Sequence, residues 1–115
     1  MSGLMHRGLP LVLTADDFAA AAAAHFGWTV EDMRGRRRAM PLARHRQIGM
    51  AAAAGCPHLS LPAIGRAFDR DHTTVLYACR LRERAWHSAY LDMSIAAVQA
   101  KAIRIAMDRV QEGAE

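Results

Sequence analysis

The stretch SLPAIGRAFDRDHTTVLYACR, residues 60–80, contains two helical patterns joined by a very short turn. Ser60 is the expected N-cap of the first helix. The apolar residues that follow share one helix face: Leu61, Ile64, Ala67 and Phe68. Asp69 and Arg70 form the expected turn. Two helices joined so closely, the first apolar on one side, predict a helix-turn-helix.

The second helix of this pair opens with polar side chains. Thr73 and Thr74 can hydrogen-bond a base edge or contact a thymine methyl group. His72 can donate or accept a hydrogen bond, and the Asp71 carboxylate can accept one from cytosine. Because the first turn of a recognition helix enters the major groove, these four side chains are the predicted base contacts. The alternative is that they only cap the helix, with Asp71 or Thr73 as the N-cap.

Working outward from this pair, the sequence predicts an all-α domain of about six helices. The expected helices span residues 14–26, 29–34, 41–54, 60–68, 71–86 and 88–111. Thr14, Thr29 and Ser88 are the expected N-caps of three of them, and Gly27 and Gly35 end the first two. The side chains expected to face the core are Phe18, Ala22, Phe26, Trp28, Val30, Met33, Leu42, Ile48, Val75, Leu76, Cys79, Leu91, Ile95, Val98, Ala102 and Ile105.

A chain of 115 residues with 52% hydrophobic content fits one compact domain. We expect residues 1–12 to be a flexible tail and residues 13–112 to be the folded domain. The amphipathic helix 88–111 belongs to that domain. Abundant alanine and few aromatic residues favour helices over sheets, and no alternating strand pattern is evident.

The positive charge is concentrated in one part of the chain. Between Met33 and Arg84, eleven arginines face three acidic residues, which gives this segment +8 while the rest of the chain carries −4. Such a block favours binding to a polyanion. A GC-rich genome would explain the preference for arginine over lysine, but it would not explain the clustering.

Several functional classes find no support in the sequence. Cys56 and Cys79 have no zinc-site spacing, and no histidine pair or paired carboxylate suggests a metal site or an enzyme. We therefore expect no cofactor, no metal and no catalytic residue. No apolar run is long enough to span a bilayer, so we expect a cytoplasmic protein with reduced thiols that does not associate with membranes.

Residues 60–68 followed by residues 70–80 resemble the C-terminal DNA-binding domain of the bacterial replication initiator family DnaA. The string Arg-Asp-His-Thr-Thr-Val, residues 70–75, matches the signature of that family. The resemblance extends upstream through residues 30–33, 36–38 and 43–47. It implies the family's helix-turn-helix fold, similar to that of the tryptophan repressor. It also implies binding to short asymmetric boxes with an A/T-rich half and a CACA-like half.

The resemblance also implies roles for individual residues. Arg38 matches an arginine that enters the minor groove. Arg46 and Gln47 match a pair that contacts the phosphate backbone, while Leu61 and Pro62 match positions that approach the DNA. The signature implies DNA contacts from Arg70, Asp71, His72, Thr73 and Thr74.

The chain departs from the family pattern in three respects. The turn is one residue shorter than usual, with Asp69 where glycines are common. Basic positions of the family are occupied here by Met40, Ala54 and Leu81, and fewer phosphate contacts predict weaker binding. No GxxxxGK[ST] motif is present, so no nucleotide or ATPase activity is expected.

The resulting prediction is sequence-specific binding of double-stranded DNA at DnaA-box-like sites, on the nucleoid. Such binding would regulate replication initiation or transcription without ATPase activity. The alternative is a protein-interaction adaptor that keeps the fold, binds a second protein through the C-terminal helix, and has degraded DNA binding.

Overall fold

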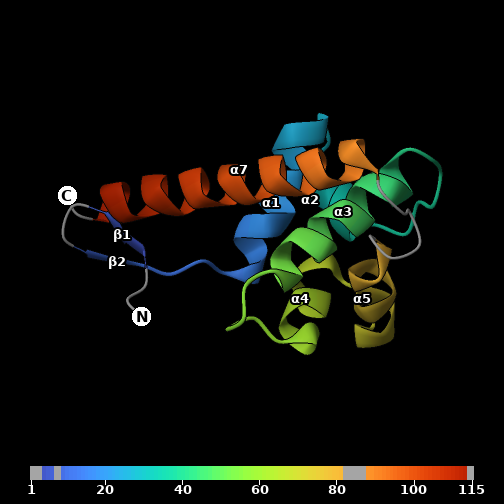
Figure 1. Cartoon of the computed structure of the whole chain (residues 1–115), viewed down its shortest axis with the longest axis horizontal. Helices are drawn as coiled ribbons and strands as arrows, with labels where there is room; N and C mark the ends of the chain where they lie inside the picture. Colours follow the sequence, from blue (N-terminus) through green and yellow to red (C-terminus); the bar gives the residue numbers. More distant parts are fainter. Residues whose placement is uncertain (1–3, 7–8, 82–87, 114–115) are drawn as a thin grey trace.

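A computed structural model describes residues 4–6, 9–81 and 88–113. The predicted all-α domain of about six helices is confirmed. Within the described residues the helices are α1 (Ala15–Phe26), α2 (Val30–Arg34), α3 (Leu42–Ala54), α4 (Leu61–Phe68), α5 (His72–Cys79) and α7 (Ala89–Gly113). Figure 1 shows α7 crossing above α1 and α3, while α4 and α5 lie side by side beneath α3.

The first two helices begin where the sequence predicted. Thr14 and Thr29 each accept a hydrogen bond from the backbone N–H three residues later, and the carboxylate at that later position accepts one from the backbone N–H of the cap residue. This reciprocal capping box satisfies two backbone donors that the helix itself leaves unpaired. Gly27 ends α1 in the left-handed conformation, at a φ of 80°, which a glycine adopts without steric cost.

The core lies where α1, α3 and α7 meet. Phe18, Ile48 and Phe68 are fully buried there, together with small alanines that let the helices approach closely. Gly49 of α3 also allows a close approach of α1, because a Cβ atom at this position would lie 2.8 Å from the Ala22 side chain. Small residues between large apolar ones therefore set the spacing of the helices that carry α4 and α5.

The connection between α4 and α5 is a tight turn. Asp69 occupies the left-handed region at a φ of 52°, and its backbone N–H caps the end of α4. Gly65 is required beneath the turn, because a Cβ atom there would lie 2.4 Å from the carbonyl oxygen of Arg70. α5 then begins after Asp71 and ends at Cys79, where Arg80 is its C-cap, so the predicted uninterrupted helix to Trp86 is wrong at this point. Residues 82–86 of that prediction lie outside the described residues.

Two residues expected in the core are more exposed than predicted. Val30 and Leu76 are each 38% exposed, although Val75 beside Leu76 is fully buried. α2 has only one and a half turns and α5 only about two, so each buries a narrow stripe. The interpretation of these two side chains as core residues was wrong.

A small antiparallel hairpin precedes the helical domain. β1 (Leu4–His6) pairs with β2 (Leu9–Leu11), and Leu4 lies opposite Leu11. The sequence predicts a flexible tail without a strand here, whereas the structure contains this hairpin beside the carboxyl end of α7 (Figure 1). Three-residue strands are too short for an alternating pattern to be recognised.

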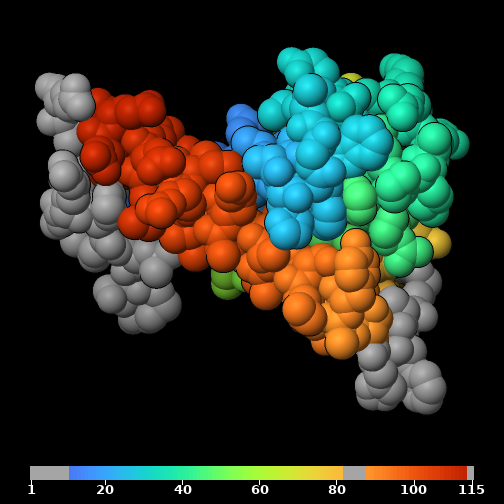
Figure 2. Space-filling view, turned by 90° about the horizontal axis from the view of Figure 1, so that it is seen from above, coloured from blue at the N-terminus to red at the C-terminus, as the bar shows by residue number. Residues whose placement is uncertain are grey.

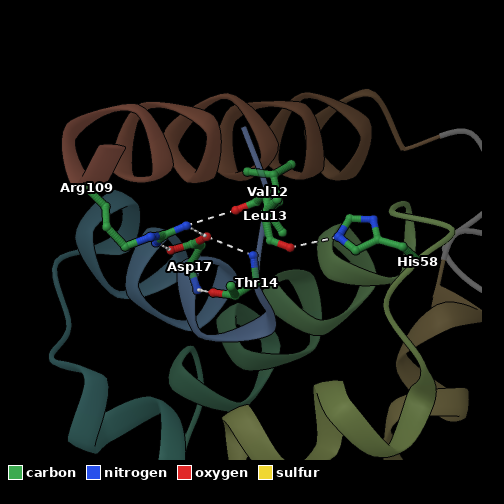
Figure 3. Close-up of polar contacts among 6 residues, drawn as sticks. All are labelled: Val12, Leu13, Thr14, Asp17, His58 and Arg109. Atoms are coloured by element: carbon green, nitrogen blue, oxygen red, sulfur yellow. Dashed lines mark hydrogen bonds and ion pairs between the residues drawn. The ribbon is translucent and has the colours of Figure 1, made fainter. Parts of the chain in front are cut away.

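Polar contacts hold the linker between the hairpin and α1 (Figure 3). The Arg109 guanidinium of α7 donates to the Asp17 carboxylate and, at 2.9 Å, to the backbone carbonyl of Val12. On the other side of the linker, His58 Nε2 lies 2.8 Å from the carbonyl oxygen of Leu13. Asp17 is only 3% exposed, so its charge is compensated by the capping box and by Arg109.

The last helix follows the sequence prediction closely. The Ser88 hydroxyl accepts from the backbone N–H of Leu91, and the inward stripe Leu91, Ile95, Val98 and Ala102 is buried. The opposite side is uncovered along its length, from its orange start to its red end in Figure 2. No helix within the described residues is long and apolar enough to cross a membrane.

Candidate nucleic-acid interface

The first turn of α5 projects its polar side chains to the surface. Asp71 accepts hydrogen bonds from the Thr73 backbone at 2.9 Å and from the Thr73 hydroxyl at 3.1 Å. These bonds lower the pKa of Asp71 below its ordinary value, so the N-cap is ionised at neutral pH. The imidazole of His72 lies 3.3 Å from the same carboxylate. His72, Thr73 and Thr74 are all exposed, so this turn is accessible to a ligand.

The arginine-rich loop after α2, residues 35–39, lies beside this turn. Arg36 and Arg38 line a recess of about 320 Å³ together with Asp69, Arg70 and Asp71. Both arginines are exposed. The fold therefore brings Arg38, the predicted minor-groove side chain, to the same surface as the start of the predicted recognition helix.

A second recess of about 420 Å³ continues this surface over α4. Pro62, Arg66 and His72 line it, and it shares Asp69, Arg70 and Asp71 with the first recess. Pro62 thus faces the same side as the α5 turn. Leu61 does not, because it lines an apolar pocket with Cys79 of α5 and Ile95 of α7. The two neighbouring residues that the resemblance grouped together face different surroundings.

Arg46 occupies a place that the sequence analysis did not predict. Its side chain is 4% exposed, and it donates to three backbone carbonyls: Met33 at 2.8 Å, Asp32 at 2.7 Å and Arg37 at 3.1 Å. Burial, with a smaller effect from the charge of Arg70, lowers the pKa of Arg46 to about 10. Arg46 is therefore protonated at neutral pH but directed into the protein, and the expected phosphate contact is corrected to an internal one.

Arg70 is also turned inward for the most part. One guanidinium nitrogen donates to the carbonyls of Phe68 and Asp69 in its own turn and, at 3.3 Å, to that of Arg34 at the end of α2. The other nitrogen donates to the carbonyl of Gly35. Burial lowers the pKa of Arg70. Gln47, the predicted companion of Arg46 in contacting the phosphate backbone, is half-buried on α3.

An aromatic cluster of Phe26, Trp28 and His45 contacts the basic loop through Arg37. Trp28 Nε1 donates to His45 Nδ1 at 2.9 Å, and the Phe26 ring stacks on His45 with centroids 3.7 Å apart. The Arg37 guanidinium lies 5.6 Å from the centroid of the Trp28 ring, within range of a cation–π interaction. Burial, and then the neighbouring His25, lower the pKa of His45, which favours the neutral ring that can accept from Trp28.

The sequence analysis missed two members of this surface. Arg36 and Arg66 both belong to the basic block, yet neither was assigned a DNA contact. Each lies in a recess beside the α5 turn. The clustering of charge was the signal that could have identified them, but only the fold shows which arginines of the block share the surface.

The side chains in these recesses are those of a binding surface. Among the described residues, no group of three His, Cys, Asp or Glu side chains could hold a metal ion. Guanidinium groups, an imidazole and the carboxylates of Asp69 and Asp71 line the two open recesses, and the exposed threonine hydroxyls of the α5 turn follow directly in the chain. Guanidinium groups are suited to phosphate oxygens, and hydroxyls and an imidazole are suited to base edges.

Comparison with known proteins agrees with this chemistry. A family model described as the bacterial dnaA protein helix-turn-helix matches residues 15–81. The chain is also similar to the chromosomal replication initiator protein DnaA of Psychromonas ingrahamii, with 48% identity over 68 residues. That alignment covers 58% of this chain and 15% of the relative, so the similarity concerns the helix-turn-helix domain.

Proposed function

The chain belongs to the family of bacterial DnaA helix-turn-helix domains, and from this premise we propose that it binds double-stranded DNA in a sequence-specific way. The proposed sites resemble the boxes of that family, with an A/T-rich half and a CACA-like half. Thr73, Thr74 and His72 would contact base edges in the major groove, and Arg38 would enter the adjacent minor groove.

One observation carries this proposal. The recess between the basic loop and the α5 turn is lined by Arg36 and Arg38 on one side and by Asp71 on the other. The first turn of α5 and Arg38 of the basic loop are exposed on the same surface. A protein needs this arrangement to contact neighbouring grooves of one duplex. An arginine is suited to the A/T-rich side, because a narrow minor groove concentrates negative potential.

We further propose that this binding needs no nucleotide and regulates replication initiation or transcription on the nucleoid, in the cytoplasm. Occupation of a box would exclude any other protein that binds it. The charge of the exposed arginines predicts a strong dependence of affinity on salt concentration, and Asp69 at the recess reduces that attraction.

The test is binding of the purified protein to a box duplex and to a scrambled duplex at physiological salt. We expect a clear preference for the box. Thr74→Ala should reduce discrimination in the CACA-like half, and Arg38→Ala should weaken binding through the A/T-rich half, each by about tenfold. Equal weak binding to both duplexes would contradict the proposal.

A protein-interaction adaptor is the second candidate, and one observation favours it. Tyr90 and Met93 on α7 are 60% and 71% exposed. Large exposed apolar side chains are typical of interfaces. If a Tyr90→Ser, Met93→Ser variant bound the box as well as the wild type but lost activity in the cell, the adaptor role would be supported.

A further inference from the structure

Three arginines near the interface donate to backbone carbonyls, and within the part of the chain that the structure describes they donate to no side chain. Arg34 donates to the carbonyls of Arg66 and Ala67 at the end of α4, at 3.1 and 2.9 Å. Arg70, in the turn after α4, donates in the opposite direction to the carbonyls of Arg34 and Gly35 at the end of α2. An arginine at the end of α2 therefore binds carbonyls at the end of α4, and an arginine in the turn after α4 binds carbonyls at the end of α2.

Arg46, from α3, also binds the end of α2 and the basic loop. It extends from α3 to the carbonyls of Asp32 and Met33 in α2 and to that of Arg37 in the basic loop. Helix carbonyls near a carboxyl end have no partner within the helix, and a guanidinium group can satisfy several of them at once. The three side chains thus join α2, the basic loop and the α4–α5 turn.

We propose that Arg46 is a positioning residue, together with Arg34 and Arg70. These side chains fix the basic loop, which carries Arg38, relative to the recognition helix α5. This inference rests on the proposed function. The carbonyl-bonded set holds residues 35–38 against the α5 turn, so that Arg38 and Thr74 meet one duplex in a single register. Pre-ordering the loop removes an entropic cost that would otherwise reduce the affinity for the box.

Burial distinguishes this role from direct phosphate contact. All three kinds of donor nitrogen on Arg46 are used within the protein, and its side chain is 4% exposed. Within the described residues, no carboxylate pairs with any of the three arginines. Asp32 and Asp69 attract Arg46 and Arg70 only from beyond ion-pair distance, so much of the positive charge still adds to the field that attracts DNA.

The first test measures the loop without DNA. Lysine keeps the charge and most of the apolar stem but cannot donate to three carbonyls in a plane, so Arg46→Lys should loosen the loop. We expect hydrogen exchange of the amides in residues 34–39 to accelerate at least about tenfold relative to the wild type. Arg104→Lys, at an exposed position of α7, is the matched control and should leave this exchange unchanged.

The second test is a double-mutant cycle in DNA binding. Arg38→Ala and Arg46→Lys should each weaken binding to the box by about tenfold, mainly through the A/T-rich half, and the double variant should bind little worse than Arg38→Ala alone. The three variants should keep wild-type discrimination in the CACA-like half. Arg70→Lys should act like Arg46→Lys if the set works as a unit. Circular dichroism melts verify that each variant is folded.

The outcomes separate the two proposals. Additive losses in the cycle, together with a salt slope reduced by about 0.9 in an Arg46→Met variant, which removes the charge, would show a phosphate contact and overturn the positioning role. Unchanged exchange of residues 34–39 in Arg46→Lys would overturn it as well, whatever the DNA result. If the wild type did not prefer the box, the proposed function would fail, while the exchange measurement would still decide whether Arg46 orders the loop.

Discussion

The two ends of the molecule use arginine in different ways. At the helix-turn-helix end, Arg46 and Arg70 are satisfied by backbone carbonyls, which are dipoles without net charge. At the hairpin end, Arg109 meets the buried carboxylate of Asp17, so the two charges compensate each other (Figure 3). Both arrangements tie distant segments together, but only the first leaves a positive field.

This difference teaches how a small domain combines rigidity with attraction for a polyanion. A salt bridge in the helix-turn-helix would order the loop equally well, but it would lower the potential toward the phosphates. The hairpin end has no such constraint. An ion pair with Asp17 there anchors α7 to the start of α1.

Gly65→Ala should disrupt the helix-turn-helix, and it has the largest expected effect. The new Cβ atom would lie 2.4 Å from the carbonyl oxygen of Arg70, so the turn between α4 and α5 must shift. We expect the free energy of unfolding to fall by about 3 kcal/mol, and box binding to be lost. Urea denaturation and a binding titration measure both. Gly113→Ala is the control, since a Cβ atom there meets nothing within 4 Å; equal effects of the two changes would refute the explanation.

Arg109→Met breaks the opposite end and should leave DNA binding intact. It leaves the Asp17 carboxylate without its charged partner, at a cost of about 2 kcal/mol in the free energy of unfolding. The cost is below that of a fully buried pair because the Arg109 side chain is 47% exposed. Arg104→Met, at an exposed position of the same helix, should change stability by less than about 0.5 kcal/mol. A loss of box preference in Arg109→Met would show that the two ends are not independent.

Asp69→Gly sharpens the comparison by raising the positive field. Glycine adopts the left-handed conformation of this residue more readily than aspartate, so stability should rise by up to about 1 kcal/mol. Removal of a negative charge from the recess should also strengthen binding to any duplex. Asp69→Asn separates the effects, because it removes the charge and gains little backbone relief. Unchanged affinity in both variants would mean that this carboxylate does not influence the bound DNA.

The aromatic support of the basic loop should make stability depend on pH, with the smallest effect of the four. Burial lowers the pKa of His45 below its ordinary value of 6.5, so below pH 6.5 the unfolded chain binds more protons at this position than the folded chain. This contribution to stability is complete above pH 6.5 and is lost as the pH falls through the folded-state pKa. Urea midpoints at pH 7.5 and 5.5 should differ less in His45→Gln than in the wild type.

Much of the fold was predictable because its signals are local. Thr14, Thr29, Ser60 and Ser88 cap helices through bonds to backbone groups three residues away, and their positions identify the helix starts directly. The exposure of Leu76 was not predictable in this way. A two-turn helix offers few residues from which to locate its buried stripe, and the packing of α5 against α3 and α4 decides it.

The sequence by itself determined the helix-turn-helix and its polar first turn, because helical periodicity and capping act within about four residues. Only the tertiary structure decided which arginines are exposed beside the α5 turn and which are directed into the protein. The carbonyls that bind Arg46 lie 9 to 14 positions away in the chain, and those that bind Arg34 lie 32 and 33 positions away. A guanidinium group gives the same signal in a sequence whether its partner is a phosphate or a backbone carbonyl, and burial alone distinguishes the two.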